Sequence, residues 1–284
     1  MIHNVSDTAK WVAFYRAMET DRPDAIFKDP FARTLAGPEG EAIVSELPRG
    51  HAMAWALIIR TAVFDEMILA SIHARGATRV LNLAAGLDAR PWRLTGLPPT
   101  LEWIDVDLPA MLEYKTHTLH DVRPVCQYRA LPADLTSASD RAALFAELSG
   151  TSPSPTLVVT EGLLIYLSEE QVGMLATDLH AQPSLQWWLL DIASPRLLKY
   201  MDKYWGRALR AGRAPFRFAP EAGTAFFEPF GWREVEFRGA SDEARRLKRE
   251  MRGAWLWRLL ARLSPAEQRE QYRRMTGFVL LGRR

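Results

Sequence analysis

Acidic side chains follow three successive apolar runs in the middle of the sequence, each where a strand is expected to end. Asp105 and Asp107 lie in the second half of LEWIDVDLP, Asp134 lies in ALPADLT, and Glu161 comes directly after LVVT. An acid about 20 residues after a strand-to-helix turn commonly accepts hydrogen bonds from ribose hydroxyls. We expect Asp105 or Asp107 to hold a sugar, Asp134 to meet an adenine edge and Glu161 to face the same site. Taken singly, each acid could instead be a solvated loop residue or a helix N-cap.

A turn of small residues precedes these acids in VLNLAAGLDARPWRL, residues Val80 to Leu94. Ala84, Ala85 and Gly86 let the backbone approach a ligand at the carboxyl end of a strand, although a purely structural tight turn has the same composition. The dinucleotide pattern G-x-G-x-x-G and the phosphate-binding pattern G-x-x-x-x-G-K-[ST] are both absent. The turn therefore indicates a nucleoside ligand without a pyrophosphate or triphosphate.

The elements that must position these residues alternate in a regular way from Arg79 onward. Short apolar runs and helix-length amphipathic segments follow one another, which is typical of an α/β fold with a mostly parallel sheet. The seven expected strands are Arg79–Leu83, Leu101–Asp105, Val125–Ala130, Leu157–Thr160, Gln186–Asp191, Arg233–Phe237 and Gly277–Gly282. Seven strands are enough for one open sheet.

The segments outside this alternation are expected to be helical. Before the first strand, the pattern indicates a helix around Thr8–Glu19, a turn at Lys28-Asp29-Pro30 and a long helix over His51–Ala74. Two later segments, Pro195–Phe218 and Ser241–Arg273, look like insertions into the alternating pattern. We expect no second domain.

Composition excludes several classes of protein. The 36 basic and 34 acidic side chains leave a net charge of +2, so nothing requires a polyanionic partner such as nucleic acid. The single Cys126 cannot form an internal disulfide, and the start of the sequence lacks an export signal, which indicates a cytoplasmic protein. Charged residues interrupt the most apolar segments, so we expect no membrane span.

Six short blocks resemble one known family. They are Asp29-Pro30-Phe31-Ala32, Ile58–Thr61, Ala84–Arg90, Asp105–Pro109, Ala133–Leu135 and Glu161–Tyr166. In this order they resemble the leucine carboxyl methyltransferase-like family of class I S-adenosylmethionine-dependent O-methyltransferases, which includes polyketide O-methyltransferases. The resemblance implies a Rossmann-like fold with helices on both faces of the sheet and S-adenosylmethionine as the cofactor. It also implies one domain over residues 1–284, comprising an N-terminal helical part (1–78), a cofactor-binding half (79–192) and an acceptor side (193–284).

Roles for individual residues follow from the same resemblance. Arg60 would pair with the methionine carboxylate of the cofactor, and Glu161 would lie near its amine. Gly86 would lie under the methionine moiety, and Ala84 stands where many members have a glycine. The ribose would be held by Asp107 in preference to Asp105, while Asp134 and Leu135 would meet the adenine. Arg16 and Tyr166 would receive an acceptor carboxylate; the plainer alternatives are a surface arginine and a core tyrosine.

The expected acceptor is a small molecule with a carboxylate or a phenol. A carboxylate needs no general base, whereas a phenol with a pKa near 10 does. Dense aromatic residues between Trp187 and Trp232 would suit a polyketide-like or aromatic acid. No metal is expected, because His117 and His120 lack a third ligand at suitable spacing.

Three alternatives stay open from the sequence. The arginine-rich C-terminal region could serve an RNA-modifying methyltransferase; its arginines are Arg245, Arg246, Arg249, Arg252, Arg273 and Arg274. The acceptor could instead be a protein carboxylate. The alanine at position 84 also leaves room for a non-catalytic relic that binds the cofactor only.

Overall fold

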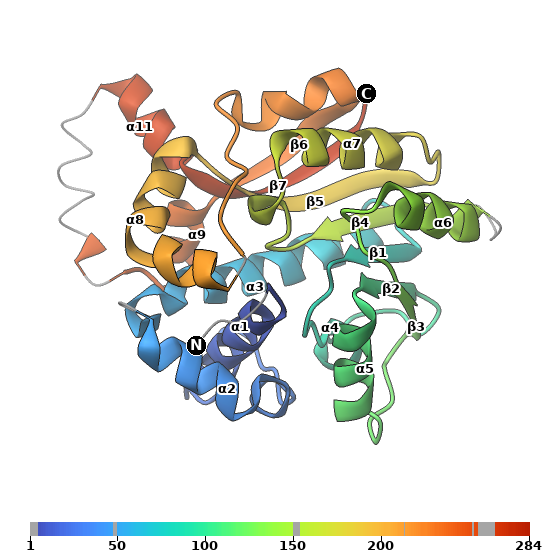
Figure 1. Ribbon diagram of the computed structural model, residues 1–284, viewed down its shortest axis with the longest axis horizontal. Coiled ribbons are helices and arrows are strands. Elements are labelled where there is room, and N and C mark those ends of the chain that lie inside the picture. Colours follow the sequence, from blue (N-terminus) through green and yellow to red (C-terminus); the bar gives the residue numbers. More distant parts are fainter. Residues whose placement is uncertain (1–4, 48–49, 150–153, 213, 252, 255–264) are drawn as a thin grey trace.

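The computed structural model describes residues 5–47, 50–149, 154–212, 214–251, 253–254 and 265–284. Seven strands form one sheet in the order β3-β2-β1-β4-β5-β7-β6 (Figure 1). The strands are β1 (Arg79–Leu83), β2 (Glu102–Asp107), β3 (Gln127–Pro132), β4 (Thr156–Thr160), β5 (Leu185–Ala193), β6 (Trp232–Gly239) and β7 (Thr276–Arg283). All seven predicted strands are confirmed, with bounds that differ by at most two residues. Only β7 runs antiparallel to its neighbours β5 and β6.

The central strands β1 and β4 are buried along their whole length because both faces of the sheet are covered. Successive side chains alternate between the faces, so that Leu81 and Val158 enter one core while Val80 and Val159 enter the other. The first core is closed by α6 (Ala138–Ser149) and α7 (Glu169–His180), and the second by α3 (Gly50–His73) and α9 (Ala240–Arg246). The expected helices on both faces are thus present.

Helices also cover the carboxyl ends of the parallel strands. We call α1 (Val5–Thr20) and α2 (Ala32–Glu46) the cap; they pack against each other, and Trp11 of α1 touches Trp205 of α8 (Pro195–Ala211) with ring centroids 5.9 Å apart. The sequence prediction missed α2 because Gly37, with φ of 59°, and Pro38 interrupt the helical pattern. The predicted long helix is α3, which lies against the sheet as well as against the cap.

Short elements complete the chain. They are α4 (Arg90–Arg93), α5 (Pro109–Thr118), the 3₁₀ helices η1 (Leu164–Tyr166) and η2 (Gly223–Phe230), and α11 (Ala266–Arg273). The predicted insertion Ser241–Arg273 contains α9 and α11, while its residues 252 and 255–264 lie outside the described part of the chain. Among the described helices, none is both long and apolar enough to cross a membrane.

The order of the strands determines where a ligand can bind. From β1 the chain moves outward through β2 to β3 and then returns to β4 on the other side of β1. Loops at the carboxyl ends of β1 and β4 therefore diverge, and open α/β sheets bind ligands in the crevice between such loops. The cap and α8 lie over this crevice (Figure 1).

Candidate functional site

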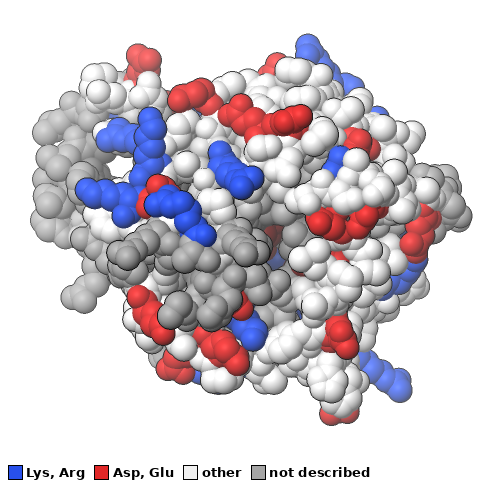
Figure 2. Space-filling view, viewed as in Figure 1, with Lys and Arg blue, Asp and Glu red and all other residues white. Residues whose placement is uncertain are grey.

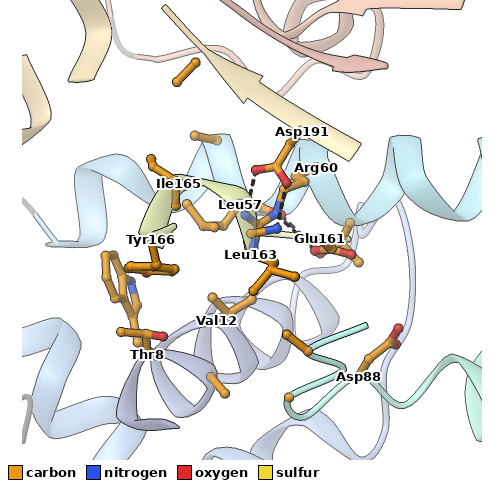
Figure 3. Close-up of a pocket in the computed structure, with 18 of the residues that line it drawn as sticks. Thr8, Val12, Leu57, Arg60, Asp88, Glu161, Leu163, Ile165, Tyr166 and Asp191 are labelled. Atoms are coloured by element: carbon orange, nitrogen blue, oxygen red, sulfur yellow. Dashed lines mark hydrogen bonds and ion pairs between the residues drawn. The ribbon is translucent and has the colours of Figure 1, made fainter. Parts of the chain in front are cut away.

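A cavity of about 340 Å³ lies in this crevice. Figure 3 shows side chains that reach it from α1 and α3, from the loops after β1 and β4, and from β5. In this view the labelled charged residues Arg60, Glu161 and Asp191 lie apart from Tyr166 and Thr8. The cavity therefore has a charged end and a second end that includes the tyrosine.

The structure brings most of the predicted site residues together around this cavity. The lining includes Arg16, Arg60, Ala84, Gly86, Asp107, Glu161 and Tyr166. It does not include Asp105, Asp134 or Leu135.

The small-residue turn after β1 forms the edge of the cavity. Ala84 and Gly86 both have positive φ angles, 52° and 49°, which favour glycine. The amide of Gly86 donates a 2.6 Å hydrogen bond to Asp107, and a Cβ on Gly86 would lie 3.3 Å from Ala9 of the cap. The turn thus has a structural role in joining β1 to β2, and it also presents backbone to the cavity.

The two acids of β2 have different surroundings. Asp107 ends the strand at the cavity, where one carboxylate oxygen accepts from Gly86 and the other accepts from Leu108 at 2.7 Å. Burial raises the pKa of Asp107, although these two backbone donors act in the opposite direction. Asp107 is therefore a partly buried acid that faces a cavity without a guanidinium partner among the ion pairs of the described residues.

Asp105 lies two residues deeper in the strand and has no exposed surface. Its carboxylate pairs with Lys115 at 2.7 Å and accepts hydrogen bonds from Asn82 at 3.0 Å and Trp103 at 2.9 Å. Lys115 is equally buried. Asp105 therefore neutralises a core lysine beneath the cavity floor.

Arg60 of α3 joins two acids at the carboxyl ends of β4 and β5. Its Nε lies 3.0 Å from Glu161 Oε1, and its Nη1 lies 3.2 Å from Asp191 Oδ2. Burial disfavours the charged guanidinium, but the two carboxylates outweigh that effect and raise the pKa of Arg60. In the described part of the chain, these ion pairs use Nε and Nη1, so Nη2 remains for a ligand carboxylate.

A second set of ion pairs supports the loop after β1. Arg90, which is 2% exposed, pairs with Asp65 at 2.6 Å and with Asp88 and Glu161 at 2.8 Å. Burial alone would raise the pKa of Asp88, but Arg90, Arg93 and more distant cations outweigh it and lower that pKa to about 2. Asp88 is therefore ionised at neutral pH, and the loop is held to α3.

Arg16 and Tyr166, the predicted acceptor-binding pair, both line the cavity but differ in their surroundings. Arg16 Nε donates to buried Asp29 at 2.8 Å, and Nη2 donates to the carbonyl of Leu87 at 2.5 Å. Burial raises the pKa of Tyr166, although Thr8 and Arg60 lower it. The Tyr166 hydroxyl is therefore protonated at neutral pH, whereas Arg16 ties the cap to the loop after β1.

The predicted adenine-binding residues lie away from the cavity lining. Asp134 Oδ1 accepts from both the amide and the hydroxyl of Thr136, at 2.8 and 2.7 Å. Leu135 is 8% exposed and packs in the core with Phe145. In this structure both residues stabilise the turn that leads from β3 to α6.

Sequence reasoning missed Asp191 and Asp65. Asp191 accepts from the amide of Gly162 at 2.6 Å as well as from Arg60, and it lines the cavity. The sequence contains a pattern that could have identified Asp191, since LLDIA places an acid near the carboxyl end of a strand, as LEWIDVD does. Asp65 lies within a helix, where nothing in its neighbours reveals that it pairs with two buried arginines.

The described residues include no group of three or more His, Cys, Asp or Glu side chains that could hold a metal ion. His117 and His120 are exposed and stack on each other at 5.7 Å near the end of α5. The candidate chemistry of the cavity therefore depends on carboxylates, guanidinium groups and hydroxyls.

Comparison with known proteins identifies the family of the chain. A family model described as leucine carboxyl methyltransferase matches residues 9–180. A protein of Streptomyces coelicolor is 32% identical over 62% of this chain and 64% of its own length, and one of Mycolicibacterium vanbaalenii is 32% identical over 75% and 73%. Both are provisionally named S-adenosyl-L-methionine-dependent methyltransferases. The chain thus spans less than two thirds of the Streptomyces relative.

Solved structures support the fold. A DUF574 family protein of Streptomyces avermitilis has a TM-score of 0.63 with 12% identity, over 98% of this chain and 97% of its own. A protein of Thermobifida fusca, provisionally named a methyltransferase, has a TM-score of 0.60 with 12% identity, over 99% and 95%. The family match covers more than half of the sequence, from the cap to the end of α7. The chain belongs to the leucine carboxyl methyltransferase family of S-adenosyl-L-methionine-dependent methyltransferases.

Proposed function

We propose that the chain is an S-adenosylmethionine-dependent O-methyltransferase that acts on a small-molecule carboxylate or phenol, as in polyketide-like secondary metabolism. The observation that carries this proposal is the position of Arg60, which lines the cavity between two acids and has Nη2 available for a ligand carboxylate. We also propose one domain, made of an N-terminal helical part (1–78) that contributes Arg60, a cofactor-binding half (79–192) and an acceptor side (193–284).

The cofactor carries a carboxylate, an ammonium group, two ribose hydroxyls and an adenine. The residues of the charged end fit these groups: Arg60 would receive the carboxylate, Glu161 the ammonium group and Asp107 the ribose hydroxyls. The close approach of backbone at Gly86 suits the methionine chain, since a side chain there would meet Ala9. We propose that the adenine extends from Asp107 toward Asp134 and Leu135, one strand further along the sheet.

When bound, S-adenosylmethionine supplies a methyl group on a positively charged sulfur, which keeps the bonding electron pair and becomes a thioether as an acceptor oxygen takes the methyl carbon. The protein needs mainly to align the acceptor and to exclude water. The Tyr166 hydroxyl, protonated at neutral pH, can donate to the acceptor oxygen. A carboxylate acceptor carries no proton, whereas a phenol gives one proton to a cavity carboxylate or to water.

Calorimetric titration with S-adenosylmethionine tests this function. We expect saturable binding by the wild type and a loss of at least tenfold in affinity for Arg60→Ala, because a charge-assisted hydrogen bond is lost. Arg141→Ala is the matched control, since Arg141 is another buried arginine paired with an acid, Asp178, but lies outside the cavity lining. Absence of binding by folded wild-type protein would refute the proposal.

An RNA substrate is not favoured by the structure around the C-terminal arginines, and on the face shown in Figure 2 basic and acidic side chains lie among one another. Arg246 pairs with Glu66 and Glu243, Arg249 with Glu19, Arg273 with Glu270 and Arg274 with Glu234. Arg245 is exposed and takes part in none of the ion pairs found among the described residues, and Arg252 lies outside the described residues. Arginines that already pair with acids neutralise few phosphates, so RNA binding that weakens steeply with salt would be needed to revive this alternative.

A further inference from the structure

The end of the cavity next to Tyr166 is apolar and rich in aromatic side chains. Trp11, Met53, Met201, Trp205 and Phe216 all line the cavity and belong to one cluster formed by the cap, α3, α8 and the segment after it. Phe216 lies 5.7 Å from Tyr166, and Trp205 lies 5.9 Å from Trp11, measured between ring centroids. A flat aromatic molecule would bury its surface well against such walls.

The charges around the cavity favour an uncharged acceptor. Four guanidinium groups line it, those of Arg16, Arg60, Arg90 and Arg93. Four carboxylates also line it, those of Asp88, Asp107, Glu161 and Asp191. Two further carboxylates lie directly behind, where Asp29 pairs with Arg16 and Asp65 pairs with Arg90 and Arg93. Among these groups, carboxylates outnumber arginines by six to four, and every arginine is paired.

Binding of the cofactor does not reverse this excess. Its sulfonium and ammonium groups carry two positive charges and its carboxylate one negative charge, so the loaded site stays negative by one. An acceptor with a carboxylate would add a further negative charge to this site, next to the apolar end of the cavity. A buried anion without a cation of its own is strongly disfavoured.

We propose that the methyl acceptor is an uncharged aromatic molecule with a hydroxyl group, a phenol and not a carboxylate. This inference rests on the proposed function and selects one of its two acceptor classes. The aromatic ring lies between Trp205 and Phe216, and the hydroxyl oxygen accepts a hydrogen bond from Tyr166. Arg16 does not hold an acceptor carboxylate, because its charge is neutralised by Asp29 at 2.8 Å.

A matched pair of probes tests the acceptor class. 2-Naphthol and 2-naphthoate share one ring system, and at pH 7 only the second is charged. We expect the protein saturated with S-adenosylhomocysteine to bind 2-naphthol at least about tenfold more tightly than 2-naphthoate, because like charges in an interface repel. Equal affinities, a preference for 2-naphthoate or no binding of 2-naphthol would overturn the proposal.

A charge variant tests the cause of the preference. Asp191→Asn removes one carboxylate and leaves Arg60 with one acid fewer, so we expect 2-naphthoate to bind about tenfold more tightly and 2-naphthol to change by less than about threefold. Asp178→Asn removes a carboxylate from the Arg141 pair outside the cavity lining and should change neither affinity. If Asp191→Asn and Asp178→Asn change the affinity for 2-naphthoate equally, or if Asp191→Asn leaves it unchanged, the charge at the cavity is not the cause of the preference for 2-naphthol.

The outcome can be separated from that of the proposed function. Titration with S-adenosylmethionine tests the function, and the naphthyl pair tests the acceptor. If the cofactor does not bind, the pair is measured on the protein alone, where the excess of two carboxylates is the same as with S-adenosylhomocysteine, because the ammonium and carboxylate charges of that ligand cancel. We expect the same preference there, and its absence would overturn the inference independently.

Discussion

The guanidinium of Arg60 packs directly on the backbone of Gly162. A Cβ built on Gly162 would lie 2.8 Å from Arg60 Nη1, closer than Cβ atoms approach other heavy atoms. Gly162 also has a φ of 69°, and its amide donates to Asp191, which in turn accepts from Arg60. The turn after β4, the arginine of α3 and the end of β5 therefore form one rigid unit.

Gly162→Ala should damage this unit in two measurable ways. The left-handed backbone alone should cost about 1 to 2 kcal/mol of unfolding free energy. Displacement of Arg60 should also weaken S-adenosylmethionine binding by about tenfold, measured by calorimetry. Gly76→Ala is the control, because Gly76 has a φ of 76° but a Cβ there would meet nothing within 4 Å. That control should lose stability and keep cofactor affinity; equal affinity losses in both variants would contradict the packing argument.

Lys115→Met tests whether Asp105 stabilises the core through its ion pair with Lys115. The substitution leaves the Asp105 carboxylate buried without its cation, which should cost about 3 to 5 kcal/mol of unfolding free energy in urea titrations. Lys10→Met is the surface counterpart, because its partner Glu39 is 57% exposed, and it should cost less than about 1 kcal/mol. A small loss for Lys115→Met would mean that Asp105 gains little from the pair.

The fold was predictable from sequence because both faces of the sheet are buried. Short runs of mainly apolar residues, such as Arg79–Leu83 and Leu157–Thr160, are separated by turns at regular intervals, and the bounds of the strands were predicted to within two residues. The helix α2 was not found, because Gly37 and Pro38 break its periodicity and packing, mainly against α1, holds its two halves in line. Tertiary contacts, which local patterns do not contain, decided that element.

The site was predictable in position but not in the partners of each residue. Asp105 and Asp107 lie on the same side of β2. The sequence does not reveal that Lys115 forms an ion pair with Asp105, whereas Asp107 lines the cavity. In the same way, the Asp29-Pro30 block was recognised without its partner Arg16. Pairing between buried charges depends on distances across the folded chain, and these pairs decide which side chains remain for a ligand.

Ala84→Gly tests whether the alanine in the cofactor loop marks a relic. Ala84 has a φ of 52°, so a glycine would relieve about 1 to 2 kcal/mol of strain while losing about 0.5 to 1 kcal/mol to chain entropy. We expect unfolding free energy to stay equal or to rise by up to about 1 kcal/mol, with cofactor affinity within about threefold of the wild type. Ala85→Gly, at a buried neighbour without positive φ, should destabilise instead. A large gain of affinity in Ala84→Gly would indicate that the methyl group had impaired the site.

Asp88 should make the stability of the protein depend on pH in the acid range. Its pKa is about 2 in the folded chain against an ordinary value of 3.8, so the unfolded chain binds its proton first as the pH falls. The ionised carboxylate therefore contributes about 2 kcal/mol above pH 4, and this contribution is lost as the pH falls from about 4 to 2. Asp88→Asn should be less stable at pH 7 and should have a shallower decline below pH 4, measured by urea titration at each pH. Asp121→Asn, at a side chain that is 86% exposed, should keep the wild-type profile. A profile for Asp88→Asn parallel to that of the wild type would show that other groups cause the acid loss.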